Sequence, residues 1–356
     1  MAPSRTPRQI AKGLLKGDIS QQPLFLPIVF SIGSRIENVP LRDFLQNPTK
    51  ISSSLKQIRN FLRCDGLACY FDPYLEAEAL GGELRWSGED LCQLILSSIS
   101  ETPDFRQRLC APEEVARKGR SPVAIDVIRR LKLMLREESV LMAGVTGPCT
   151  LSSRLLGLEM GEVRERGHVS APAAEFAAEA TGQMAAKFVE AGADVIFIVE
   201  EALPVFSAEA FDDWVSLLVP VLNVIRFYEA LPVLLLTDSR SVASNWERLF
   251  NQRWDCVLCP AMVGLEMGIL SEIARSKGTL LGMALPLELF HLHHSNRDSL
   301  LQTIRDIFRD LRPVLLTTGG DIPATTDMKH LSETIQLVRH LAKDAIQGKA
   351  PEGSAQ

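Results

Sequence analysis

The chain has 356 residues, of which 46% are hydrophobic and 23% charged, so it has enough apolar material for a large folded core. Its formal net charge of -6 and its pI near 5.7 argue against a nucleic-acid or anionic-membrane surface. No apolar run is as long as a bilayer span, and no apolar segment behind the N-terminus would make a signal peptide. We therefore expect a cytoplasmic protein.

Eight short apolar runs recur along the chain and predict its strands. The first begins at Leu24, and the others span residues 67–71, 140–145, 194–199, 232–236, 255–259, 279–283 and 313–316. They are rich in Val, Ile and Leu and do not alternate with polar residues, which is typical of parallel strands covered by helices on the outside.

Segments with helical periodicity separate these runs, and a short amphipathic helix precedes them at residues 7–16. Eight strand–helix units predict a (β/α)8 barrel. A doubly wound open sheet is the competing α/β fold, but its Gly-x-Gly-x-x-Gly turn is missing. We expect one barrel domain over residues 1–347, with a helical insertion at about 87–138 and a disordered tail at 348–356.

In a barrel of this kind the chemistry lies where the strands end. The side chains that follow the runs are acidic or hydroxylic, with a few arginines: Ser34, Arg35, Asp72, Thr146 to Thr150, Glu200, Glu201, Thr237, Asp238, Arg240, Cys259 and Thr317 to Asp321. Asp72 is the first catalytic candidate, because it ends a buried run and begins a polar loop. Glu200 and Glu201 are neighbours in a strand, so at most one of them faces inward.

None of the six histidines follows a strand, which argues against Ser-His-Asp and Cys-His chemistry. The cluster from His291 to His294 has the spacing of a metal site, but a solvated loop explains it as well. Cys256 and Cys259 lie three apart in one strand, so their thiols point to opposite faces and cannot hold one ion. We expect no metal in the site.

The sequence resembles the uroporphyrinogen decarboxylase superfamily, which includes the decarboxylase and corrinoid-linked methyltransferases. The resemblance runs along nearly the whole chain, and its strongest segments are Asp72-Pro-Tyr-Leu-Glu-Ala-Glu-Ala-Leu-Gly-Gly-Glu-Leu, Gly147-Pro-Cys-Thr-Leu, Val189-Glu-Ala-Gly-Ala-Asp, Phe206-Ser-Ala-Glu-Ala-Phe and Leu315-Leu-Thr-Thr-Gly-Gly-Asp-Ile-Pro. The family fold is a (β/α)8 barrel, which agrees with the strand count.

The resemblance implies roles for individual residues. Asp72 matches the aspartate that binds pyrrole nitrogens in the decarboxylase and stabilises the cation formed when a ring carbon is protonated. The loop that grips substrate carboxylates keeps one arginine, Arg35, within Ser31-Ile-Gly-Ser-Arg35. Arg154 replaces a family tyrosine and can bind a carboxylate, while Gly319 replaces a family histidine.

Membership of the methyltransferase branch can be tested by looking for the zinc ligands that are typical of it. Many members use a His-x-Cys pair after the fifth strand and a cysteine after the eighth, whereas this chain has Leu236-Thr-Asp238 and Gly319. That zinc site cannot form. A methyltransferase or demethylase with other ligands, such as Asp238 with Cys259 or the His291 cluster, stays open.

Our leading interpretation is a cofactor-free lyase that resembles uroporphyrinogen decarboxylase and acts on a tetrapyrrole or a related carboxylated aromatic substrate. Asp72 would be catalytic, and Arg35, Arg154, Glu201, Asp238 and Thr318 would bind substrate. The alternatives are a corrinoid-dependent methyltransferase or O-demethylase, with zinc and a corrinoid protein as partner, and a protein that binds such a ligand without turnover. Family analogy also suggests a homodimer.

Overall fold

We analysed a computed structural model of the chain. It describes residues 5–19, 22–87, 91–95, 105–166, 168–201, 203–237, 246–260, 267–290 and 297–347. The expected tail at 348–356 lies outside these residues. Among the described helices, none is long and apolar enough to cross a membrane.

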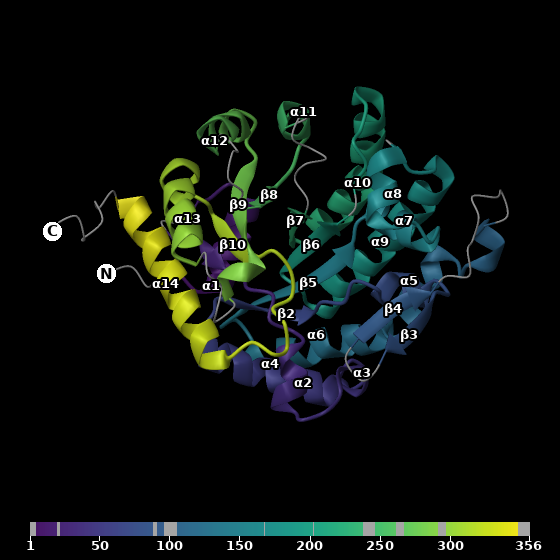
Figure 1. Ribbon diagram of the computed structural model, residues 1–356, viewed down its shortest axis with the longest axis horizontal. Coiled ribbons are helices and arrows are strands. Elements are labelled where there is room, and N and C mark those ends of the chain that lie inside the picture. The colour runs from purple at the N-terminus through teal and green to yellow at the C-terminus, as the bar shows by residue number, and fades with distance from the viewer. Residues whose placement is uncertain are drawn as a thin grey trace.

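Eight parallel strands form a nearly closed barrel with helices around it (Figure 1), as predicted. Around the barrel the strands follow the order β1-β10-β9-β8-β7-β6-β5-β2. Their bounds are β1 Leu24–Phe25, β2 Gly66–Tyr70, β5 Val140–Thr146, β6 Val195–Glu200, β7 Leu231–Leu236, β8 Cys256–Pro260, β9 Leu280–Leu285 and β10 Leu315–Thr318. Each of the eight apolar runs contains or overlaps one of these strands.

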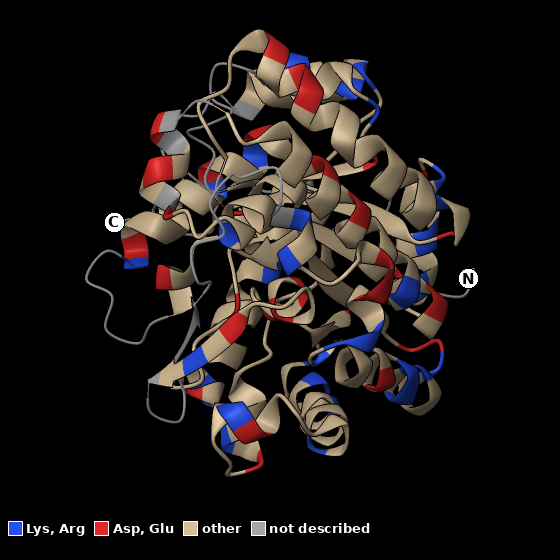
Figure 2. Ribbon diagram, turned by 90° about the vertical axis from the view of Figure 1, so that its right-hand side faces the viewer, with Lys and Arg blue, Asp and Glu red and all other residues tan. Residues whose placement is uncertain are grey.

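The α-helices of the described residues are α1 Pro7–Leu15, α2 Ile32–Ile36, α3 Leu41–Phe44, α4 Pro48–Leu62, α5 Leu75–Ala79, α6 Ser121–Leu135, α7 Pro148–Leu155, α8 Met160–Arg166, α9 Ala171–Ala191, α10 Ala208–Phe227, α11 Trp246–Asn251, α12 Met267–Ser276, α13 Arg297–Leu311 and α14 Met328–Gln347. Short 3-10 helices span η1 Phe105–Arg108, η2 Pro112–Arg117 and η4 Leu287–Phe290. Figure 2 shows Lys and Arg interspersed with Asp and Glu on the outer helices, so both signs of charge share this surface.

Side chains of most strands alternate between the barrel interior and the layer of surrounding helices. In β6, Val195, Phe197 and Val199 belong to the inner cluster, whereas Ile196 and Ile198 belong to the outer one. This alternation follows from the two-residue period of a strand. It explains why the runs are apolar throughout, since both faces are buried.

The bottom of the barrel is covered by α1. Its residues Ala11 and Leu14 join the inner cluster, and the Arg8 guanidinium donates to Asp194 at 2.6 Å. Both side chains of this pair are 6% exposed. The amphipathic helix predicted near the N-terminus therefore closes the end of the barrel that lies opposite the strand C-termini.

The seam between β1 and β2 carries no strand ladder. Asp65 bridges it, because its carboxylate accepts a hydrogen bond from the Phe25 N–H at 2.8 Å and its own N–H donates to the Phe25 carbonyl at 3.3 Å. Gly66 is required at this seam, since a Cβ there would lie 2.6 Å from a methyl carbon of Leu26. The side chain and the backbone N–H of Asp65 thus connect β1 to the start of β2 at this seam.

The segment expected as a helical insertion has two parts. Strands β3 (Glu83–Ser87) and β4 (Leu91–Ile95) form an antiparallel hairpin outside the barrel, which the sequence did not suggest. The later helix α6 packs against α4, α9, β2 and β5, so it is one of the barrel's own helices. Between α5 and α6 the described residues therefore contain a hairpin and two 3-10 helices.

Candidate functional site

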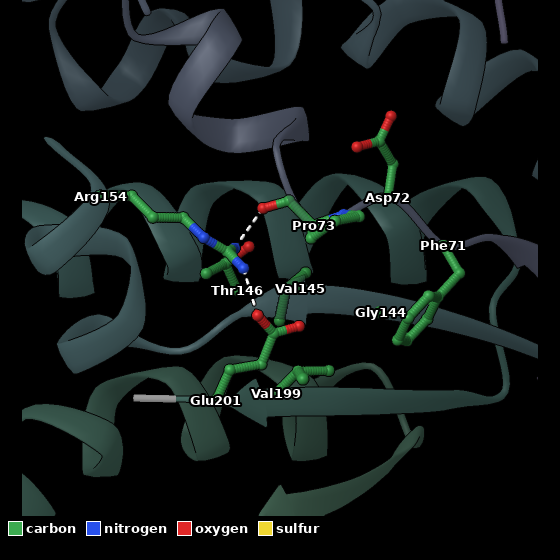
Figure 3. A pocket seen from close by; sticks show the side chains of 9 residues that line it. All are labelled: Phe71, Asp72, Pro73, Gly144, Val145, Thr146, Arg154, Val199 and Glu201. Carbon is green, nitrogen blue, oxygen red and sulfur yellow. Dashed lines mark hydrogen bonds and ion pairs between the residues drawn. The ribbon is translucent and has the colours of Figure 1, made fainter. Parts of the chain in front are cut away.

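A pocket opens where β2, β5 and β6 end. Its walls are Phe71, Asp72, Pro73, Gly144, Val145, Thr146, Arg154, Val199 and Glu201 (Figure 3). Asp72, Arg154 and Glu201, three of the residues selected from the sequence, thus share one pocket. It lies at the end of the barrel where active sites of this fold occur.

The floor of the pocket is apolar. The Phe71 ring lies on the backbone of Gly144, where an added Cβ would be 2.8 Å from a ring carbon. Val145 and Val199 complete the floor and are at most 6% exposed. A concave apolar surface with a few polar groups at its border is typical of sites for small organic ligands.

Asp72 forms a buried ion pair that the sequence did not suggest. Its carboxylate accepts hydrogen bonds from the guanidinium of Arg120 and from the Tyr74 N–H at 2.9 Å. Arg120 also donates to Glu78 at 2.7 Å, and the Asp72 and Arg120 side chains are 6% and 7% exposed. Burial lowers the pKa of Arg120, but Asp72, Tyr70 and Glu78 together more than offset this, so the pKa lies above its ordinary value and the guanidinium stays charged.

The opposite wall is the pair Arg154 and Glu201. The guanidinium of Arg154 donates to the Glu201 carboxylate and to the Pro73 carbonyl, and it lies 5.2 Å from the centre of the Tyr74 ring. The Arg154 and Glu201 side chains are 15% and 27% exposed, so both are more accessible than Asp72. In Figure 3 the Asp72 carboxylate points away from this pair.

Glu200 and Glu201 point in opposite directions, as the strand period predicts. Glu200 is 1% exposed and accepts hydrogen bonds from the Thr150 N–H at 2.9 Å, the Thr150 hydroxyl at 2.7 Å and the Trp214 indole at 3.0 Å. Burial raises the pKa of Glu200. This carboxyl group anchors α7 and α10 behind the pocket and does not line it.

A second buried carboxyl group lies directly behind the pocket wall. Glu76 of α5 accepts hydrogen bonds from the Thr146 hydroxyl at 2.8 Å and from the Thr146 N–H at 3.2 Å. Burial raises its pKa, against the opposing effects of Thr146 and Arg154. Thr146 therefore connects the interior of the pocket to a buried acid.

Arg35 and Thr318 lie elsewhere in the barrel mouth, outside the walls of this pocket. Arg35 donates to the backbone carbonyls of Ala324 at 2.8 Å and Thr326 at 3.3 Å. Thr318 is fully buried; its hydroxyl accepts from the Ile28 N–H at 3.0 Å and donates to the Gly320 carbonyl at 2.7 Å. These contacts join β1, β10 and the following loop, and substrate binding by either residue stays a prediction.

Asp321 closes the same loop against α2. Its carboxylate accepts hydrogen bonds from the Phe30 N–H at 2.7 Å and the Ser31 N–H at 2.9 Å. Burial raises the pKa of Asp321 to about 6, and the charge of Asp72 adds to this effect. Two carboxyl groups in the barrel mouth therefore influence each other.

Asp238 and the cluster from His291 to His294 lie outside the described residues, so their predicted roles stay untested. Within the described part of the chain, no three His, Cys, Asp or Glu side chains gather as metal ligands. Burial raises the pKa of Cys259 to about 12 and that of Cys149 well above its usual value. The donors of the described mouth do not fit a zinc–thiolate site.

Sequence reasoning missed Arg120 and Glu76. Arg120 directly precedes Ser121-Pro122, a signal for the first turn of a helix, and this would have placed its side chain at the start of α6. Glu76 lies in an alanine-rich segment and reads as an exposed helical residue, but α5 is enclosed by η2, α6, α7 and α9. Its burial depends on these tertiary contacts.

Comparisons with known proteins agree with this architecture. Residues 28–341 match the family described as uroporphyrinogen decarboxylase (URO-D). No curated protein matches the chain. A methyltransferase from Methanosarcina mazei has the same fold, with a TM-score of 0.73 and 16% identity, over 95% of this chain and 99% of that one.

Two methionine synthases are more distant in structure. A B12-independent enzyme from Shewanella sp. W3-18-1, solved with selenomethionine, has a TM-score of 0.52 and 10% identity over 86% of this chain and 89% of its own. A putative vitamin-B12 independent methionine synthase from Listeria monocytogenes has a TM-score of 0.50 and 11% identity, with coverages of 91% and 96%. At these identities the likeness concerns the fold.

Proposed function

The chain belongs to the uroporphyrinogen decarboxylase family, and from that membership and the pocket we propose a cofactor-free carboxy-lyase. Its substrate would be a tetrapyrrole or a related carboxylated aromatic compound. The observation that carries the proposal is the guanidinium of Arg154 at the border of an apolar floor, with carboxylates on two sides.

Arg154 is the group best placed to hold a substrate carboxylate. A guanidinium has five N–H donors in a planar fork. The bonds to Glu201 and Pro73 use two of them, so others are available to a ligand that lies on the floor. Binding would weaken or replace the contact with Glu201, which is the more exposed partner of the pair.

Asp72 would act as a fixed negative charge. Asp72 and Glu78 carry two negative charges and Arg120 one positive charge, so the three side chains together carry one negative charge. Arg120 and the Tyr74 N–H hold the Asp72 carboxylate in one orientation. A preorganised anion stabilises a developing cation without the cost of reorganisation during the reaction.

The chemistry would proceed in two steps on an electron-rich ring. A proton adds to the ring carbon that carries the carboxylate or, in a tetrapyrrole, the carboxymethyl group, which forms a C–H bond and a ring cation. The carbon–carboxylate bond then breaks, its electron pair neutralises the cation, and carbon dioxide leaves; with a carboxymethyl group this first gives an exocyclic methylene, which becomes a methyl group when the added proton moves from the ring carbon to it. One proton is consumed for each carbon dioxide, and neither oxidant nor reductant is needed.

Methyl transfer is the second candidate, favoured by the fold shared with the M. mazei methyltransferase along nearly the full length of both chains. It would need a methyl carrier, such as a corrinoid protein as partner. Among the described residues no three His, Cys, Asp or Glu side chains gather as metal ligands, so the proposed reaction includes no metal. We also propose that the protein is cytoplasmic and forms a homodimer.

The test is carbon dioxide release from uroporphyrinogen and from a panel of electron-rich aromatic acids. We expect Arg154→Met to raise KM because it removes the carboxylate contact, and Asp72→Asn to lower kcat because it removes the anion. Asp310→Asn, at an exposed site on α13, is the matched control and should retain full activity. Transfer of a methyl group to a thiol or corrinoid acceptor, with no carbon dioxide from any acid, would favour the second candidate.

A further inference from the structure

Glu76 is a buried acid with a single polar neighbour between it and the pocket. Its side chain belongs to a residue that is 1% exposed, and Thr146, which lines the pocket, is 5% exposed. The Thr146 hydroxyl lies 2.8 Å from Glu76 Oε2, and the Thr146 N–H lies 3.2 Å from Oε1. The proposed lyase reaction consumes one proton, so a proton donor must reach the bound substrate.

The hydrogen bond between the Thr146 hydroxyl and the Glu76 carboxyl group can run in either direction. A threonine hydroxyl has one hydrogen to donate and can accept at the same time. When Glu76 is ionised, the hydroxyl of Thr146 donates to it. When Glu76 carries a proton, Oε2–H donates to Thr146, and the hydroxyl hydrogen of Thr146 becomes available to the pocket.

We propose that Glu76 and Thr146 form a proton relay, in which the buried carboxyl group supplies a proton to the bound substrate through the Thr146 hydroxyl. The inference rests on the proposed lyase function and identifies its proton source. Thr146 would touch the substrate, whereas Glu76 would act through Thr146.

The surroundings of Glu76 favour its protonated form. Burial raises its pKa, because a carboxylate loses its hydration inside the protein. The hydrogen bonds from Thr146 and the charge of Arg154 on α7 act in the opposite direction. On α6, Arg120 is paired with Asp72 and Glu78, and the charged residues of η2 (Glu113, Glu114 and Arg117) and the nearby Glu175 and Glu179 of α9 are exposed.

The proton transfer balances without a further reactant. The hydroxyl hydrogen of Thr146 moves to the ring carbon as the hydrogen of Glu76 Oε2 moves to Thr146 Oγ1. The carbon–carboxylate bond then breaks, and its electron pair returns to the ring. Glu76 is left ionised, and it regains a proton from water through Thr146 after the products leave.

The first experiment measures the titration of Glu76 in the free protein by NMR with ¹³C-labelled glutamate. The Glu76 signal is assigned with Glu76→Gln, and the signal of exposed Glu179, assigned with Glu179→Gln, is the reference. We expect a higher midpoint for Glu76 than for Glu179. Thr146→Val should raise that midpoint further, because the donor to the ionised form is lost, whereas Thr146→Ser should not. Equal midpoints for Glu76 and Glu179 would overturn the relay.

The second experiment measures the affinity for benzoate, a carboxylated aromatic probe, by calorimetry across a pH series. A protonated Glu76 leaves the Thr146 hydroxyl free to donate to the ligand carboxylate, so affinity should fall above the Glu76 midpoint, by at most about tenfold per pH unit. Glu76→Gln should make affinity independent of pH, because its amide donates to Thr146 at every pH. Thr146→Ser should restore the pH dependence that Thr146→Val removes.

The outcomes separate the relay from the lyase function. Binding that needs Arg154 but does not depend on pH overturns the relay alone. No binding at any pH overturns both the substrate class and the relay. Binding that depends on pH through Glu76, without carbon dioxide release from any acid, supports the relay and contradicts the lyase.

Discussion

Replacing Arg120 tests whether a buried ion pair holds the carboxylate of Asp72. The change is Arg120→Met, which keeps much of the side-chain length and removes the charge. At pH 7 it leaves Asp72, whose side chain is 6% exposed, without a cation and also frees Glu78, whose side chain is 22% exposed. Removing one partner of a buried pair costs about 3–5 kcal/mol, so we expect an unfolding free energy lower by about this amount.

The assay is urea unfolding followed by tryptophan fluorescence. Arg248→Met is the matched control, because its pair with Asp212 is 40% and 50% exposed and should contribute at most about 1 kcal/mol.

A loss below about 1 kcal/mol for Arg120→Met at pH 7 would refute this reasoning. A double-mutant cycle with Asp72→Asn isolates the pair, and an interaction energy near zero would show that the two side chains do not cooperate.

Three further predictions concern the floor, the bottom and the outer layer of the barrel. Gly144→Ala places a Cβ 2.8 Å from the Phe71 ring and should cost about 1–3 kcal/mol and weaken benzoate binding, measured by unfolding and calorimetry. Arg8→Met breaks the buried pair below the barrel and should cost about 3 kcal/mol while benzoate affinity stays unchanged. Trp214→Phe removes a donor to the ionised form of Glu200 and should cost about 1–2 kcal/mol in unfolding experiments at pH 8. Since burial already raises the pKa of Glu200, that loss should be smaller at pH 5, where the protein holds more of the protonated form.

The strands could be predicted because each carries a local signal. In β6 and β7 both faces are buried, so the runs are apolar throughout and stand out from the amphipathic helices between them. The same two-residue period predicted that at most one of Glu200 and Glu201 faces inward, and the structure places Glu201 in the pocket. Local patterns therefore predicted the barrel and the opposite directions of these two side chains.

The charge environment of the site could not be predicted in this way. Asp72 pairs with Arg120, which is 48 residues further along the chain, beyond a hairpin whose path no local pattern indicates. Glu76 is buried only because four other elements enclose the short helix α5. Both features depend on tertiary packing. The sequence predicted separate side chains, whereas the structure pairs Asp72 with Arg120 and Glu76 with Thr146.

The central claim is that the pocket between Asp72 and Arg154 removes carbon dioxide from a carboxylated ring. The most direct measurement is carbon dioxide release from uroporphyrinogen and the aromatic acid panel by the wild-type protein, Arg154→Met and Asp310→Asn. We predict release by the wild-type protein and Asp310→Asn, and a loss of at least tenfold in kcat/KM for Arg154→Met. Equal release by all three proteins, or methyl transfer without carbon dioxide, would contradict the account.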